Sequence, residues 1–105
     1  MTLAPHVTGH FPSGDVTLFY RLFGEPGETP ILIQHGANYF DSYDWIEVAA
    51  GLATDRQVLA MDMRGFGETT WSPSRDYSMD ARMDDIQAGM AHLGWQRVIP
   101  MVHSM

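Results

Sequence analysis

Three short apolar runs constrain the fold of this chain more than any other feature. They span Ile31–Gln34, Val58–Met61 and Val98–Val102, and each is apolar at successive rather than alternate positions. A run of this kind, bounded by turn residues, is typical of a parallel strand that is buried on both faces. Because parallel strands need a long crossover between them, the segments that separate the runs must carry the chain back along the sheet.

Both separating segments have the periodicity of amphipathic helices. The first, about Trp45–Ala53, has Asp41 or Ser42 available as its N-cap. The second, about Met79–Leu93, follows a capping serine and ends before Gly94. We expect its apolar positions to form a core stripe, which consists of Met79, Met83, Ile86, Met90 and Leu93.

An antiparallel hairpin is predicted ahead of these elements. Val7–Phe11 and Val16–Phe23 are β-prone runs joined by Pro12–Asp15, and Gly24–Pro30 follows as a loop. A hairpin followed by strand–helix–strand–helix–strand predicts an α/β protein with right-handed crossovers. With 105 residues and 45 % apolar content, the chain suits one small globular domain.

The charge balance and the residue types exclude several kinds of partner. The chain has 13 acidic and 6 basic residues, a formal net charge of -7 and no Cys. Nucleic acids and anionic membranes bind basic patches, so we expect neither as a partner. The five His lack a ligand-like grouping, so no metal or other cofactor is proposed. Met1–His10 lacks a signal-peptide pattern and no run could span a bilayer, which predicts a soluble, cytoplasmic protein.

Candidate site residues follow the carboxyl ends of the three predicted parallel strands. The segments are His35–Asn38, Arg64–Glu68 and His103 onward. In an open parallel sheet, ligands bind at this edge, so the three segments should be neighbours in space. Ser104, at the end of a buried strand, stands where a nucleophile would be held.

Together these motifs resemble the α/β-hydrolase fold superfamily, from about Val7 to Met105. H-G at 35–36, D-x-R-G-x-G-x-T at 62–69 and V-H-S-M at 102–105 have its order and spacing, so the chain looks like the N-terminal portion of a serine hydrolase. The resemblance implies that Ser104 is the nucleophile and that the backbone N–H groups of Ala37 and Met105 form the oxyanion hole.

The other residues near this edge receive lesser roles. Asn38 and Tyr39 are candidates for substrate contact, and Trp71 also borders the site, although aromatic side chains are common on surface loops. In the family pattern the D-x-R-G-x-G-x-T segment is a structural turn, so no chemistry is assigned to Asp62, Arg64, Gly65 and Gly67. We interpret His35 as ordering its loop and His103 as structural. For Asp84 and Asp85 we expect a solvated face with at most one buried partner.

The implied activity is that of a cofactor-free serine hydrolase acting on a carboxylic ester, a lactone or a related acyl substrate. Relatives with an aspartate nucleophile, such as dehalogenases and epoxide hydrolases, are disfavoured because position 104 is serine. Serine-based relatives that cleave carbon–carbon bonds or run perhydrolysis stay open as alternatives.

Two residues depart from the family pattern, and the acid and the His base of the family are absent. All three observations argue against catalysis by this chain alone. Val102 replaces the first glycine of G-x-S-x-G, where a β-branched side chain should clash or open the turn. Pro100 suits a strand only where its nitrogen faces an unpaired edge. In the family, the acid and the His base follow the nucleophile in chain order, so no His here can be that base.

We therefore expect residues 1–105 to be a single incomplete domain that is inactive alone. Val98–Val102 would be an exposed apolar edge, open to a C-terminal half, to a second chain or to self-association. The competing interpretation is a truncated or degenerate piece that acts only by association or binding.

Overall fold

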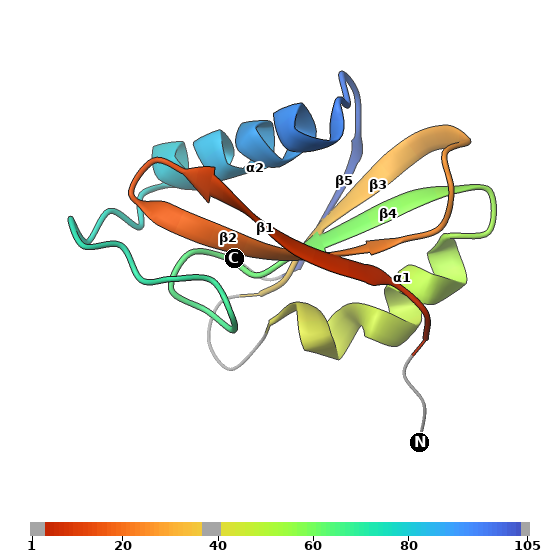
Figure 1. The fold of residues 1–105 in the computed structure, drawn as a ribbon, viewed down its shortest axis with the longest axis horizontal. Helices are drawn as coiled ribbons and strands as arrows, with labels where there is room; N and C mark the ends of the chain where they lie inside the picture. The colour runs from red at the N-terminus through yellow and green to blue at the C-terminus, as the bar shows by residue number, and fades with distance from the viewer. Residues whose placement is uncertain (1–3, 37–40, 104–105) are drawn as a thin grey trace.

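A five-stranded sheet lies at the centre of the protein, with helices on both of its faces (Figure 1). The computed structural model describes residues 4–36 and 41–103. In chain order the elements are β1 (Val7–Ser13), β2 (Val16–Phe23), β3 (Glu28–Gln34), the 3-10 helix η1 (Ser42–Trp45), α1 (Ile46–Leu52), β4 (Arg56–Met61), α2 (Met79–Leu93) and β5 (Ile99–Val102). Neither α-helix in this described part is long and apolar enough to cross a membrane.

The strands are arranged in the order β1-β2-β4-β3-β5. β1 pairs with β2, and β2 with β4, in antiparallel fashion. β3 lies between β4 and β5 and is parallel to both. The predicted α/β architecture, a hairpin followed by parallel strands with helical crossovers, is therefore confirmed.

The two faces of the sheet have separate cores, which explains why the parallel strands are apolar at successive positions. Leu32 and Leu59 point to the face covered by α2, whereas Ile31, Ile33 and Val58 point to the face covered by α1. Successive side chains of a strand lie on opposite faces, so a strand covered on both sides needs apolar residues throughout.

Three strands are longer than predicted, because tertiary contacts extend them, and β5 begins at Ile99 rather than Val98. β4 begins at Arg56 rather than Val58. β1 continues through Ser13, which leaves only Gly14 and Asp15 in the hairpin turn. β3 begins at Glu28 rather than Ile31, so the predicted loop Gly24–Pro30 is shorter. The Glu28 N–H donates to the Asp55 carbonyl at 2.9 Å, which draws this segment into the sheet before a register shift.

The predicted core stripe of α2 is wrong in its first two turns. Met79 and Met83 are 57 % and 48 % exposed, and the helix instead buries Ala81, Asp85 and Gly89. Asp85 faces inward because it pairs with a buried arginine, and Gly89 lets the helix approach the sheet closely. The rest of the stripe packs against the core as predicted, at Ile86, Met90 and Leu93.

Pro100 fits its strand because β5 is an edge strand in the part of the chain that the structure describes. The His103 N–H donates to the Gln34 carbonyl of β3 at 3.2 Å. Backbone donors alternate between the two sides of a strand, so the nitrogen of Pro100 faces away from β3. No ladder hydrogen bond to β3 is lost.

Candidate functional site

The carboxyl ends of the three parallel strands lie side by side, as predicted. Gln34, the last residue of β3, is in register with Met61 of β4 and with Val102 of β5. All three strands therefore end in one row, and the loops that follow them start as neighbours. This row is the frame of the candidate active site.

The predicted nucleophile and its partners lie outside the described residues. They are Ser104, Met105, Ala37, Asn38 and Tyr39. The roles assigned to them stay predictions. The clash expected at Val102 also stays a prediction, because it concerns the chain from Ser104 onward, which lies outside the described residues. The structure describes the residues that flank them, and the hydrogen bonds of these flanking residues hold the loops at this edge in place.

His35 joins the loop after β3 to the loop after β4. Its ring is fully buried, and its Nε2 accepts a hydrogen bond from the Met63 N–H at 2.9 Å. Because Nε2 accepts, the proton is on Nδ1, which donates to the Gly36 carbonyl at 2.7 Å. Phe66 packs edge-on against the ring. Both ring nitrogens are occupied, which confirms the loop-ordering interpretation of His35.

Asp62 is the second buried link between the same two loops. One carboxylate oxygen accepts from the Ser42 N–H and the other from the Glu68 N–H, both at 2.7 Å. Its carbonyl accepts from the Thr69 hydroxyl at 2.7 Å. Gly67 has a φ of 51°, and a Cβ there would collide with the Asp62 carboxylate. The segment 62–69 is thus a tightly hydrogen-bonded turn, in agreement with a structural role.

Arg64, the arginine of this turn, fastens the loop to α2. It binds the Asp85 carboxylate through two hydrogen bonds of 2.8 and 2.9 Å, and it donates to the Asp76 carbonyl at 2.6 Å. The Ser13 hydroxyl also donates to Asp85. The hydrogen bonds to Asp85 raise the pKa of Arg64 above its usual value. Asp85 is buried and Asp84 is exposed, so one member of the acidic pair has a buried partner, as predicted.

Both flanks of residues 37–40 are tied to consecutive residues of the loop after β4. Gly36 is held to Met63 through His35, and Ser42 is held to Asp62 directly. Beyond Ser42 the 3-10 helix starts with a capping box between Asp41 and Asp44. A backbone fixed in advance is the condition under which N–H groups stabilise a developing oxyanion.

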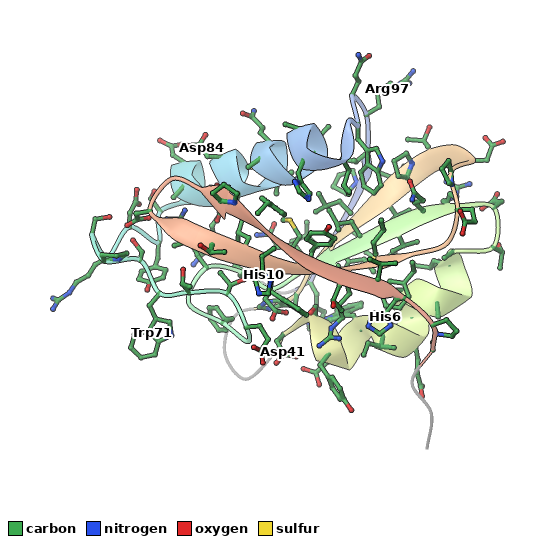
Figure 2. The ribbon with its side chains drawn as sticks, viewed as in Figure 1. His6, His10, Asp41, Trp71, Asp84 and Arg97 are labelled. Carbon is green, nitrogen blue, oxygen red and sulfur yellow. The ribbon has the colours of Figure 1, made fainter. Side chains whose placement is uncertain are left out.

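The described contacts of His103 and Trp71 assign neither residue a catalytic role. The ring of His103 lies edge-on to Trp45, with 5.5 Å between centroids, which supports a structural role. Trp71 is 77 % exposed and projects outward from the loop after β4 (Figure 2). Nothing in its described contacts assigns it to the site.

A hollow of about 340 Å³ lies beside Pro30, Trp95 and Arg97. These residues are at the amino ends of β3 and β5, opposite the candidate site. Within residues 4–36 and 41–103 no group of three or more His, Asp or Glu side chains could hold a metal ion.

Two residues that hold this edge of the sheet in place, Ser42 and Arg21, are not predicted by the sequence patterns. Ser42 entered only as a possible N-cap, but Asp41 is the cap and Ser42 is buried between Asp62 and Arg21. Arg21 belongs to β2, and no spacing in the sequence connects it with the loop after β3. Only the antiparallel placement of β2 beside β4 brings it there.

Comparison with known proteins identifies a family and several relatives with similar sequences. The family model described as "alpha/beta hydrolase fold" matches residues 29–105. Epoxide hydrolase 4 of Homo sapiens is 27 % identical over 103 residues, which are 97 % of this chain and 28 % of that protein. The bifunctional esterase/perhydrolase DCH of Acinetobacter calcoaceticus is 32 % identical over 92 residues, which are 85 % of this chain and 32 % of that protein.

Solved structures give the same result. A putative epoxide hydrolase from Pseudomonas aeruginosa superposes with a TM-score of 0.87 at 27 % identity, over 99 % of this chain and 35 % of that one. An epoxide hydrolase from Vigna radiata, at 23 % identity, shares the fold with a TM-score of 0.84, over 94 % of this chain and 32 % of that one. The chain thus spans about a third of the length of the proteins that it matches.

Proposed function

The chain belongs to the alpha/beta hydrolase fold family, and from this membership we propose that it is the N-terminal part of a cofactor-free serine hydrolase. Its substrate would be a carboxylic ester, a lactone or a related acyl compound. One observation carries the proposal: Val102 lies in the row where all three parallel strands end, and a serine, Ser104, comes two residues later in the sequence. A nucleophile at that place would meet the loop after β3.

In the proposed reaction, the Ser104 hydroxyl attacks the acyl carbon and its proton passes to a His base. The backbone N–H groups of Ala37 and Met105 would stabilise the oxyanion, and Asn38 and Tyr39 would contact the substrate. The intermediate expels the alcohol, which takes the proton, and water then releases the acid. His35 is not the base, because both of its ring nitrogens are occupied. We place the base and its carboxylate outside these 105 residues.

The identity of the nucleophile separates acyl hydrolysis from epoxide opening. Several matched proteins are named epoxide hydrolases, whereas Ser104 favours acyl chemistry. The test is to treat the full-length protein with a fluorophosphonate probe and to find the labelled residue by peptide mass spectrometry. We expect labelling of Ser104, and turnover of p-nitrophenyl acetate without turnover of styrene oxide. An intact, folded protein that opens the epoxide and stays unlabelled at Ser104 would contradict the proposal.

A second candidate is perhydrolysis by the same serine, in which hydrogen peroxide replaces water at the acyl-enzyme. It is favoured by the likeness to a protein named esterase/perhydrolase. Peracid formation from an ester and hydrogen peroxide would identify it. Carbon–carbon bond hydrolysis is the remaining serine-based alternative, and a vinylogous diketone substrate would reveal it.

For the 105 residues alone we propose an inactive piece that binds further polypeptide along β5. Ile99 and Val102 are 42 % and 53 % exposed, on opposite faces of this edge strand. All 13 acidic residues of the chain precede position 86, so the segment from there on has no acidic side chains, which suits an apolar interface. The occupant that we favour is a C-terminal part that packs against this edge, since the chain spans about a third of its relatives.

Size-exclusion chromatography with light scattering tests this part of the proposal. The chain alone should associate or aggregate, and the full-length protein should be monodisperse. Val102→Lys should reduce the association of the chain alone, whereas Val7→Lys, at an exposed residue of the other edge strand, should not. A monomeric chain of 105 residues with esterase activity would exclude the inactive-piece interpretation.

A further inference from the structure

Arg21, on β2, contacts the segment that leads out of the loop after β3. Its Nε donates to the Ser42 hydroxyl at 3.0 Å. Ser42 is buried, and its own N–H donates to Asp62 at 2.7 Å. The backbone of Ser42 is therefore held by the loop after β4, and its side chain is held by β2. Two segments that are distant in sequence fix the start of the 3-10 helix.

The guanidinium of Arg21 is held in place on several sides. Its Nη1 donates to Nε2 of His6 at 3.1 Å, and its carbon lies 5.0 and 5.5 Å from the ring centroids of Phe19 and Tyr43. His6 is fixed in turn, because its Nδ1 donates to the Ala4 carbonyl at 2.7 Å. Figure 2 shows His6 and the N-cap Asp41 on the same side of the sheet as α1.

This arrangement uses the shape of the arginine rather than ion pairing. Among the described side chains, carboxylates form ion pairs with Arg56 and Arg64 but not with Arg21, although the chain carries a net charge of -7. A planar guanidinium that stacks on aromatic rings and donates in fixed directions cannot be replaced by a lysine ammonium. The contacts thus point to a requirement for geometry at Ser42.

We propose that Arg21 is a positioning residue for the site at the carboxyl edge, and that it acts through Ser42. The inference rests on the proposed function, in which the loop after β3 supplies an oxyanion donor. Ser42 and His35 connect that loop to Asp62 and Met63. A loosened Ser42 would leave only one of these two connections intact. Small displacements of catalytic groups are costly, and we expect a loss of about tenfold in the chemical step.

The test measures fluorophosphonate labelling of Ser104 in the full-length protein as a function of probe concentration. In Arg21→Lys we expect the rate constant at saturating probe to fall about tenfold, with little change in the half-saturating concentration. Amide exchange at Ser42 should accelerate, and the melting temperature should change little. Arg97→Lys is the matched control, because Arg97 is exposed and lies far from Asp41 in the molecule (Figure 2).

Ser42→Ala keeps the arginine and removes its acceptor, so it serves as an independent variant if Arg21→Lys folds poorly. It should slow labelling to a similar extent, and the double variant should be no slower than either single variant. Additive losses, or an unchanged labelling rate and Ser42 exchange in Arg21→Lys, would overturn the proposal. If the parent protein does not label at Ser104, the proposed function fails, whereas Ser42 exchange still tests the role of Arg21.

Discussion

The Nε2 of His35 accepts a hydrogen bond from the Met63 N–H at 2.9 Å, inside the carboxyl edge of the sheet. This bond joins two loops that are 28 residues apart in sequence. It also fixes the tautomer of the imidazole, so the ring acts as a neutral bridge. Residues that look catalytic in such a motif can thus have a purely architectural role.

His35→Ala should destabilise the protein by about 3 kcal/mol, because it removes two hydrogen bonds and leaves the Met63 N–H buried without an acceptor. Urea denaturation followed by tryptophan fluorescence measures this change. The control is His10→Ala, at an exposed histidine on β1, which should cost less than about 0.5 kcal/mol. Equal effects of the two substitutions would contradict the bridging role.

Gly67→Ala should be among the most damaging glycine substitutions in this chain. Its φ of 51° is unfavourable for a side chain, and the new Cβ would collide with the Asp62 carboxylate. We expect a loss of about 3 kcal/mol in the free energy of unfolding. Gly51→Ala is the contrasting variant, since Gly51 is an exposed position of α1 with open space around it. It should stabilise by about 0.5–1 kcal/mol, and the opposite order would refute this account.

Asp85→Asn and Asp84→Asn should differ sharply although the residues are adjacent. Asp85 binds Arg64 through two hydrogen bonds in a buried site, and its neutralisation leaves the buried cation with only the longer ion pair to Asp15, at 3.5 Å. We expect a loss of about 3–5 kcal/mol for Asp85→Asn and almost none for the exposed Asp84. Chemical denaturation of both variants gives the comparison. Similar stabilities would mean that the ion pair contributes little.

The stability of the β1–β2 turn region should depend on pH through Asp15. Hydrogen bonds from the Ser72 and Ser74 hydroxyls, at 2.5 and 2.6 Å, hold the pKa of Asp15 well below its ordinary value of 3.8. A carboxyl whose pKa is lower in the folded state stabilises the fold above its unfolded pKa, and this contribution is lost as the pH falls.

Melting temperatures recorded from pH 7 down to pH 2 test this linkage. The parent protein should lose stability below about pH 4, and Asp15→Asn should show a smaller loss over the same range. The two curves should therefore converge as the pH falls. Parallel curves throughout the range would show that Asp15 does not contribute in this way.

Local sequence patterns were sufficient for much of the fold. The bounds predicted for α2, Met79–Leu93 after Ser78 and before Gly94, are those of the structure, because capping and left-handed residues act within one turn. The meeting of three strand ends at one edge was also predictable, since parallel strands with helical crossovers must end on the same side.

The sequence by itself determined which segments form strands and helices, and it predicts that Ser104 follows a strand end at the carboxyl edge of the sheet. Only the tertiary structure decided that Asp85 points inward while Met83 points out, because a pattern of apolar spacing cannot register an ion pair with a residue 21 positions away. The bond from Arg21 to Ser42 has the same origin. Periodicity reports on neighbours along the chain, whereas the hydrogen bonds that hold this edge join residues that the folded sheet brings together.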